Sequence, residues 1–182
     1  MRTVALTKES TKDILENLLK RSPNNYGKFE SAVDEILHKV KTEGDSALFA
    51  YTKEFDKTEI TADTIKVTEE EIKEAYEAVD PVLIDVIRKA LVNIRSYHEK
   101  QRQNSWFTSE TNGTMLGQKV TALERVGVYV PGGKAVYPSS VLMNIIPAKV
   151  AGVDQIVMTT PPGKDGKVTP TTLVAAKEEV GG

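Results

Sequence analysis

The sequence contains no cysteine, and this absence removes several classes of site at once. Disulfides, thiolate nucleophiles and cysteine-ligated zinc or iron–sulfur centres are excluded, and the composition fits a reducing compartment. The chain also lacks an excess of positive charge, because 24 Lys and Arg residues are set against 26 Asp and Glu residues, for a formal net charge of −2. This balance gives no electrostatic basis for binding nucleic acid or an anionic membrane.

Long hydrophobic runs are missing as well. The N-terminal residues MRTVALTKES lack the apolar stretch of a signal peptide, and no segment approaches the roughly 18 apolar residues of a membrane span. With 182 residues, of which 40% are hydrophobic and 27% charged, the composition is that of a globular protein. We therefore expect a cytoplasmic protein with neither a nucleic-acid nor a membrane partner.

Familiar catalytic motifs are also absent. The sequence has no Gly-x-Ser-x-Gly elbow, no Walker-type lysine loop and no His-Glu-x-x-His helix, so hydrolase, phosphate-loop and zincin interpretations lack their usual basis. His38 and His98 fall on different predicted helices without a second histidine one turn away, and we interpret both as solvated or core-edge residues. The acidic run at 69–71 lies at a predicted helix N-terminus, where the backbone dipole favours negative charge. No residue is assigned a catalytic or metal-binding role.

Helical periodicity dominates the first half of the sequence. Apolar residues on one stripe predict helices over 10–20 and 28–42, and Gly44 is placed to end the second of them. Thr68 and Glu71 have the spacing of a capping box, in which the side chain of each residue satisfies a backbone N–H group of the other. A short helix is expected to follow.

The longest predicted helix begins at Asp80–Pro81, because proline at a first helical position loses no hydrogen bond, and it extends to about Gln103. The residue composition changes after this helix. Residues 105–120 are rich in aromatic and threonine side chains around Asn112–Gly113, a dipeptide suited to the left-handed angles of a two-residue hairpin turn. We predict a β-hairpin near 105–120.

The last third alternates between strand and helix. The patterns predict strands at 125–130 and 154–160 and helices at 139–152 and about 170–179. This order implies a parallel sheet with right-handed crossovers. A parallel sheet of two strands leaves apolar faces and edges uncovered, so we expect either a fragment of a longer protein or a sheet completed by a partner. A small domain with a flexible tail is the alternative.

One stretch has features of a ligand site. In VGVYVPGGKAVYPSSVLMN, residues 126–144, a predicted strand runs into a Pro-Gly-Gly turn just before a helix that Ser139 or Ser140 is placed to cap. Glycines permit positive φ and close approach to the backbone, and free N–H groups at a helix start attract phosphates and carboxylates. A glycine pair also serves many proteins only as a tight corner. From the residues alone, a corner and a ligand cradle are equally supported.

A resemblance to a known protein family favours the ligand cradle over the tight corner. The run ERVGVYVPGGKAVYPSSVLMNIIPAKVAGVDQIVMTTPP, residues 124–162, resembles a segment typical of histidinol dehydrogenase, with its Y-V/I-P-G-G turn, S-T/S-V-L-M helix start and P-A-K/R-x-A-G-V helix end. GDSALFAYTKEFD at 44–56 resembles the family's G-D-x-A-L-x-x-Y-T-x-x-F-D, and NIRSYHEKQ is followed by LGQKVTALERVGVYVPGG in the same order. The resemblance covers essentially the whole chain.

The resemblance implies an activity. Members of that family oxidise L-histidinol through the aldehyde to L-histidine in two successive NAD-dependent steps, as zinc-dependent homodimers well over twice as long as this chain. Their catalytic Glu–His pair and the Gln, His and Asp ligands of zinc lie beyond the positions that match residue 182. The resemblance therefore implies the N-terminal portion of such an enzyme, inactive when isolated. Alternatives are a related dehydrogenase acting on another polar alcohol and a non-catalytic nucleotide-binding or assembly module.

The resemblance also assigns site residues and an α/β fold. Tyr129 matches the family tyrosine that touches NAD, and Pro131, Gly132 and Gly133 match the turn beside it. We expect a mainly helical region over 1–120 with the hairpin near its end, then the start of a Rossmann-like NAD-binding region over 121–182. That Rossmann-like βαβα unit is expected to be incomplete.

Overall fold

The computed structural model describes residue 5 and residues 7–12, 27–132 and 136–180. The chain forms two compact units, Met1–Ala50 and Tyr51–Gly182. The expected functional division near residue 120, between a helical region and a cofactor-binding region, stays a prediction.

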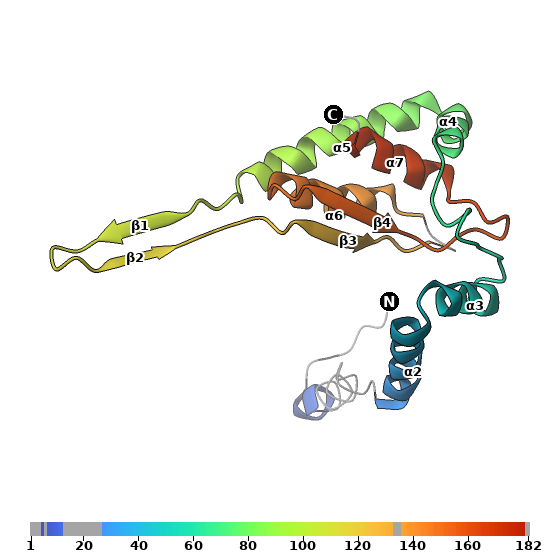
Figure 1. Ribbon diagram of the computed structural model, residues 1–182, viewed down its shortest axis with the longest axis horizontal. Helices are drawn as coiled ribbons and strands as arrows, with labels where there is room; N and C mark the ends of the chain where they lie inside the picture. The colour runs from blue at the N-terminus through green and yellow to red at the C-terminus, as the bar shows by residue number, and fades with distance from the viewer. Residues whose placement is uncertain (1–4, 6, 13–26, 133–135, 181–182) are drawn as a thin grey trace. The chain divides into compact units, whose positions relative to one another are not determined.

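The described part of the first unit is helical except at residues 5, 7 and 44, and its last helix continues into the second unit. Helix α2 spans Gly27–Glu43 and helix α3, Asp45–Phe55, begins directly after it (Figure 1). Gly44 lies between them with φ of +62°, in the left-handed region that glycine adopts without a side-chain penalty. The predicted helix end at this residue is confirmed. Of the helix predicted over 10–20, only residues 10–12 are described, and these are helical; the rest lies outside the described residues.

Two helix starts in the second unit form as predicted, one at the Thr68–Glu71 capping box and one with Pro81 as the first helical residue. Helix α4, Glu69–Ala78, begins with the Thr68–Glu71 capping box, in which the Thr68 hydroxyl accepts from the Glu71 N–H at 3.2 Å and the Glu71 carboxylate accepts from the Thr68 N–H at 2.8 Å. Helix α5, Pro81–Glu99, begins after Asp80, whose side chain accepts from the Val82 N–H at 2.8 Å. Helix α5 ends four residues earlier than the periodicity predicts.

The hairpin is present, but its turn differs from the prediction. Strands β1, Trp106–Ser109, and β2, Met115–Gln118, pair antiparallel. The Glu110 N–H donates to the Thr114 carbonyl, so three residues, rather than two, form the loop. Among the described loop residues only Gly113 has a positive φ, of +85°. A two-residue type I′ turn needs positive φ at both Asn112 and Gly113, whereas a three-residue loop needs a single left-handed residue.

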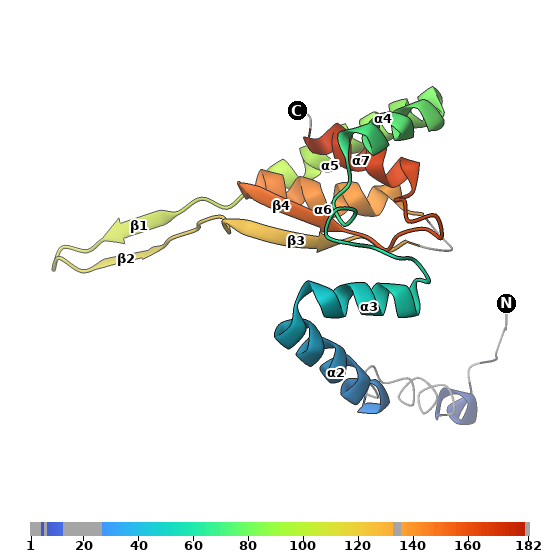
Figure 2. The same ribbon diagram turned by 45° about the vertical axis from the view of Figure 1, so that its right-hand side comes forward.

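The βα alternation produces a parallel pair of strands. Strand β3, Arg125–Tyr129, lies beside β4, Gln155–Thr159, in a register that sets Arg125 opposite Gln155 and Tyr129 opposite Thr159. Helix α6, Pro138–Val150, connects them, and α7, Pro170–Val180, follows β4. Helices α5, α6 and α7 lie on the same side of this sheet in both views (Figures 1 and 2). The predicted α/β fold is confirmed.

The core lies between the sheet and those helices. Side chains of Val128, Ile156 and Met158 pack against it, and Val126 lies half-buried on the same face, as expected for a sheet covered on one face. Fully buried members come from the end of β3 and from α6 and α7: Val130, Val141, Leu142, Ile145, Ile146, Val174 and Ala175. The other face of the sheet is open within this unit, with Tyr129 and Val157 exposed on it; that further strands complete the sheet stays a prediction.

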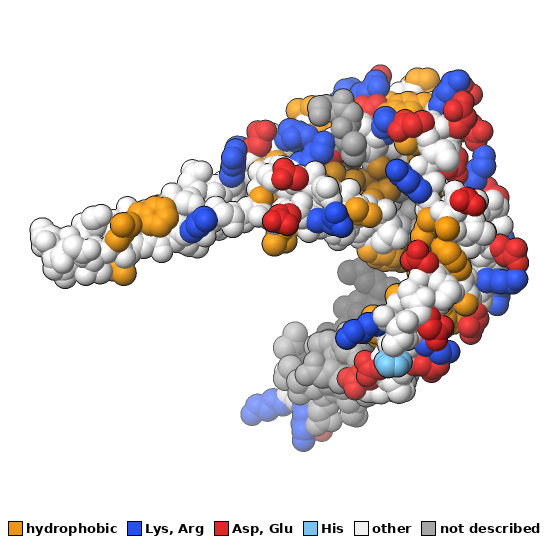
Figure 3. All heavy atoms as spheres, in the orientation of Figure 1, with side chains coloured by type: hydrophobic (Ala, Val, Ile, Leu, Met, Phe, Trp, Pro, Cys, Tyr) orange, Lys and Arg blue, Asp and Glu red, His pale blue; other side chains and the backbone are white. Residues whose placement is uncertain are grey.

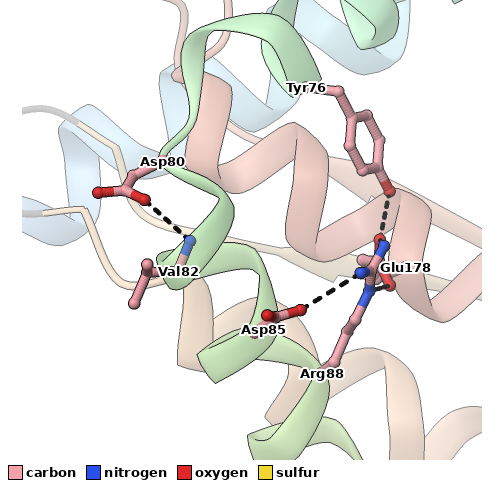
Figure 4. A network of polar contacts seen from close by, with 6 residues as sticks. All are labelled: Tyr76, Asp80, Val82, Asp85, Arg88 and Glu178. Carbon is pink, nitrogen blue, oxygen red and sulfur yellow. Dashed lines mark hydrogen bonds and ion pairs between the residues drawn. The ribbon is translucent and has the colours of Figure 1, made fainter.

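Polar contacts tie α7 to its neighbours (Figure 4). The Glu178 carboxylate accepts from Nε and Nη2 of Arg88 on α5, both at 2.8 Å, and from the hydroxyl of Tyr76 on α4 at 2.8 Å. The next residue, Glu179, is buried, and one of its carboxylate oxygens accepts from Nη2 of Arg95 at 2.5 Å. Two adjacent carboxylates of α7 therefore hold it to α5 in different surroundings.

Candidate functional site

Tyr129 lies at the carboxyl end of β3, with 61% of its surface exposed. The next residue, Val130, is completely buried, and its N–H donates to the Thr159 carbonyl at 2.9 Å, which extends the pairing of β3 with β4 by one step. Because successive side chains of a strand point to opposite faces, burial of Val130 turns Tyr129 toward the open face. The tyrosine ring is therefore available to a ligand at the edge where open parallel sheets bind them.

Gly132 is placed next to the loop that follows β4. A Cβ atom at this position would lie 3.2 Å from the Pro161 carbonyl oxygen and 3.5 Å from the Thr160 hydroxyl oxygen. The missing side chain therefore lets the chain's own backbone approach closely. Positive φ is found at four other described glycines and not at Gly132, so the left-handed conformation allowed there by the sequence is not used.

Pro131, the first residue of the turn, is exposed, whereas Gly132 is half-buried. Gly133 lies outside the described residues, as does Lys134. The predicted cofactor contacts at Tyr129, Pro131, Gly132 and Gly133 remain predictions. The geometry adds that Gly132 serves as a corner, because its open side already faces Thr160 and Pro161.

The start of α6 also differs from the prediction. The N-cap residue is Tyr137, which makes no side-chain capping bond, and Pro138 is the first helical residue. Ser139 and Ser140 lie inside the first turn and do not cap the helix, so the prediction that one of them caps it is wrong. The reason is Pro138, whose fixed φ starts the helix one residue before the serines. The N-terminal turn keeps the partial positive charge of a helix start beside the Tyr129 edge.

A second loop at this edge was missed by sequence reasoning. After β4 the chain closes a tight turn in which the Gly163 N–H donates to the Lys167 carbonyl at 2.8 Å and the Gly166 N–H to the Gly163 carbonyl at 3.0 Å. The hydroxyl of the buried Thr58 also donates to the Gly163 carbonyl, at 3.0 Å. The glycine spacing in PPGKDGK was the available signal.

A lysine of this second loop is already paired. The Lys167 ammonium lies 2.6 Å from a carboxylate oxygen of Glu74 on α4. This hydrogen bond, together with the charge of Glu74, raises the pKa of Lys167. The cation of this loop, Lys167, is therefore paired with the protein's own Glu74 carboxylate.

No metal centre forms in the part of the chain that the structure describes. No three His, Asp or Glu side chains there converge on a common point. His98 lies with Nδ1 2.7 Å from the Gln101 side-chain oxygen, and His38 lies in the other compact unit, exposed on α2. These residues do not fit a zinc ion.

No helix in the described residues is long and apolar enough to cross a membrane.

A cavity of about 810 Å³ lies at the opposite end of the same sheet. Its walls come from the base of the hairpin, the end of α5 and the end of α6, and include Arg102, Ser105, Val120, Val126 and Val150. Val126 lies near the start of β3, whereas Tyr129 is at its end. The cavity is therefore separate from the Tyr129 edge, and no sequence pattern indicated it.

Comparison with known proteins gives one consistent family. The sequence profile described as histidinol dehydrogenase matches residues 19–180. Histidinol dehydrogenase of Bacillus subtilis (strain 168) is 60% identical over 146 residues, which are 80% of this chain and 34% of the relative. That of Heliobacterium mobile is 52% identical over 163 residues, covering 90% of this chain and 38% of the relative.

A solved structure agrees with the sequence comparisons. The crystal structure of histidinol dehydrogenase from Elizabethkingia anophelis superposes with a TM-score of 0.76 at 36% identity, over 83% of this chain and 34% of that one. The chain thus spans between about a third and two fifths of the length of the relatives that it matches.

Proposed function

Since the chain belongs to the histidinol dehydrogenase family, we propose that it supplies the first part of the NAD-binding region of an enzyme that oxidises L-histidinol to L-histidine. The observation that carries the proposal is the exposed Tyr129 ring at the carboxyl end of β3, beside the start of α6. The comparisons favour this function over the alternatives of another alcohol substrate or a non-catalytic module.

The chemistry needs two successive oxidations. In the first, the alcohol carbon gives a hydride to NAD and the hydroxyl loses a proton, which yields the aldehyde. In the second, the aldehyde adds water, and the resulting hydrate gives a hydride to another NAD and loses two protons, which yields the carboxylate. Bound NAD accepts the hydride, and the protein supplies placement and electrostatics.

The residues of this chain contribute to placement. Tyr129 offers a ring face and a hydroxyl to a planar cofactor, and the first turn of α6 offers partial positive charge to an anionic group. Gly132 fixes the corner between them by allowing contact with Pro161. Because the described residues hold no set of zinc ligands, we assign no step to a metal here. Zinc, the homodimer and a cytoplasmic location belong to the proposal for the complete enzyme.

The isolated chain is therefore expected to be inactive. The test is to purify the 182 residues and follow NADH formation with L-histidinol, NAD and added zinc. We expect no turnover, and weak or no NAD binding by calorimetric titration. Robust turnover would contradict the incomplete site, and micromolar NAD affinity abolished by Tyr129→Ala would show that one edge suffices for binding.

A further inference from the structure

The β1–β2 hairpin is the least covered apolar element of its unit. All eight strand residues are exposed, and each strand has one neighbour in the described sheet, so both outer edges are open. In both ribbon views the hairpin stands apart from helices α4, α5, α6 and α7 of its own unit (Figures 1 and 2). Figure 3 shows apolar side chains along it, with no other segment over them on the face in view.

Apolar side chains lie on both faces of the hairpin. The register pairs Trp106 with Gln118 and Thr108 with Leu116 on one face, and Phe107 with Gly117 and Ser109 with Met115 on the other. The four large apolar residues are 55–67% exposed. We call Trp106, Phe107, Met115 and Leu116 the hairpin surface.

Such a surface is not expected to stay in water. A two-stranded hairpin is at best marginally stable alone, and open edges with exposed apolar side chains mark interaction sites or aggregation liabilities. The Phe107 ring closes over Gly117, where an added Cβ would collide with it. This contact orders one face locally and leaves the Trp106 face without such a cover.

We propose that the hairpin surface docks against the polypeptide corresponding to the part of histidinol dehydrogenase that this chain does not match, and that it orders the two parts of the enzyme relative to each other. The proposal rests on the proposed function. Roughly two thirds of each matched relative has no counterpart here, which provides ample chain to flank both faces and to reach the cavity at the hairpin's foot, where Ser105 and Val120 are shared walls.

A second copy of this chain fits the surface less well. A twofold contact between two hairpins covers one face of each and leaves the other exposed, whereas apolar residues occupy both faces here. The strands of the hairpin carry no charged residue, so no charge complementarity favours a second copy either. The two occupants are separated by experiment.

The test uses a chimera in which residues 1–180 are joined to the part of the Bacillus subtilis relative that follows the matched region. Trp106 is the only tryptophan of this chain. Labelling both proteins with 5-fluorotryptophan therefore gives a single ¹⁹F resonance for the 182-residue chain, and Trp106→Phe identifies the same resonance in the chimera. We expect solvent-exposed Trp106 in the chain and protected Trp106 in the chimera.

Substitution supplies the second readout. Trp106→Ser is expected to leave the unfolding midpoint of the 182-residue chain nearly unchanged but to lower that of the chimera by on the order of 5–10 °C, because the side chain is buried only in the latter. Trp106→Phe is expected to restore most of the chimera's midpoint. An equal drop in both proteins would overturn the proposal, as would a chimera with the native hairpin that fails to fold.

Two further outcomes decide between occupants and between proposals. A ¹⁹F shift of the 182-residue chain that grows with its own concentration would identify a second copy as the occupant and overturn the proposal. A chimera that protects Trp106 yet forms no NADH would contradict the proposed function and support the docking surface. A chimera that oxidises L-histidinol with Trp106 still exposed would do the reverse.

Discussion

The adjacent carboxylates of α7 allow a sharp test of the packing, because their environments act in opposite directions. Glu178 accepts two hydrogen bonds from Arg88 and one from Tyr76. The Arg88 hydrogen bond is the main cause that lowers the pKa of Glu178, against a smaller opposing effect of burial. Burial is the main cause that raises the pKa of Glu179, against the charges of Arg95 and Lys149.

The signs of the pH dependence follow by linkage. Glu178 contributes stability that is present above its ordinary pKa of 4.5 and is lost as the pH falls through its lower folded pKa. Glu179 behaves oppositely, because its folded pKa is raised: its contribution is full below 4.5 and is lost as the pH rises through the folded value. Replacing each with glutamine removes that residue's pH dependence while keeping its size.

The magnitudes come from the contacts. Glu178→Gln removes the charge from three hydrogen bonds, and since Arg88 is half exposed to water we expect a loss of about 1–2 kcal/mol at neutral pH. Glu179→Gln removes a buried charge with one unpaired oxygen, Oε2, while leaving a new amide donor unpaired, so we expect a change within about 1 kcal/mol at neutral pH.

The assay is urea unfolding of the 182-residue chain and both variants at intervals between about pH 2 and pH 8, a range that includes the values below 4.5 at which the Glu178 contribution is lost. Relative to the parent, Glu178→Gln is expected to become more destabilising as the pH rises, and Glu179→Gln more favourable. Since the two residues are neighbours on one helix, each variant is the control for the other. Slopes of the same sign for both variants would refute the assignment of their environments.

Further predictions concern the turn, the caps and the second loop. Gly132→Ala is expected to destabilise the chain by about 1 kcal/mol, because the added Cβ would press on the Pro161 carbonyl. In the control Gly127→Ala the added Cβ meets nothing within 4 Å, so no loss of stability is expected. Equal losses of the two variants in thermal unfolding would contradict this. Asp80→Ala is expected to cost about 1 kcal/mol by loss of the α5 cap, while Ser140→Ala, which removes no cap, stays within about 0.5 kcal/mol; a comparable loss for the serine would restore it as a cap. Thr58→Val removes the bond to the Gly163 carbonyl and is expected to speed amide exchange of Gly166 and Lys167, with α5 amides as the internal control; unchanged exchange would show that Thr58 does not hold the loop.

Local signals were reliable where the interacting atoms are close in sequence. Thr68 and Glu71 are three residues apart, and Pro81 starts its helix through the fixed φ of its own ring. Gly44 ends its helix for a reason that resides in its own backbone. The prediction that Ser139 or Ser140 caps α6 was wrong because the preceding proline starts the helix first, so that two valid local signals competed.

Contacts between distant residues could not be predicted from one sequence. Tyr76 and Glu178 are 102 residues apart, and Thr58 and Gly163 are 105 apart. No local pattern distinguishes Glu178, which is paired with Arg88, from Glu179, which is buried, because the distinction depends on how α5 and α6 pack against α7. For the same reason the turn at Gly132 was open to two interpretations until Pro161 was found beside it.

The central claim is that Tyr129 lies on one wall of an NAD site that this chain alone does not complete. The most direct measurement is histidinol-dependent NADH formation by the 182-residue chain, by the chimera with the remainder of the Bacillus subtilis relative, and by its Tyr129→Ala variant. We predict no NADH from the chain, two NADH per L-histidinol from the chimera, and a raised KM for NAD in the variant. Turnover by the chain alone, or a variant chimera with an unchanged KM for NAD, would contradict the claim.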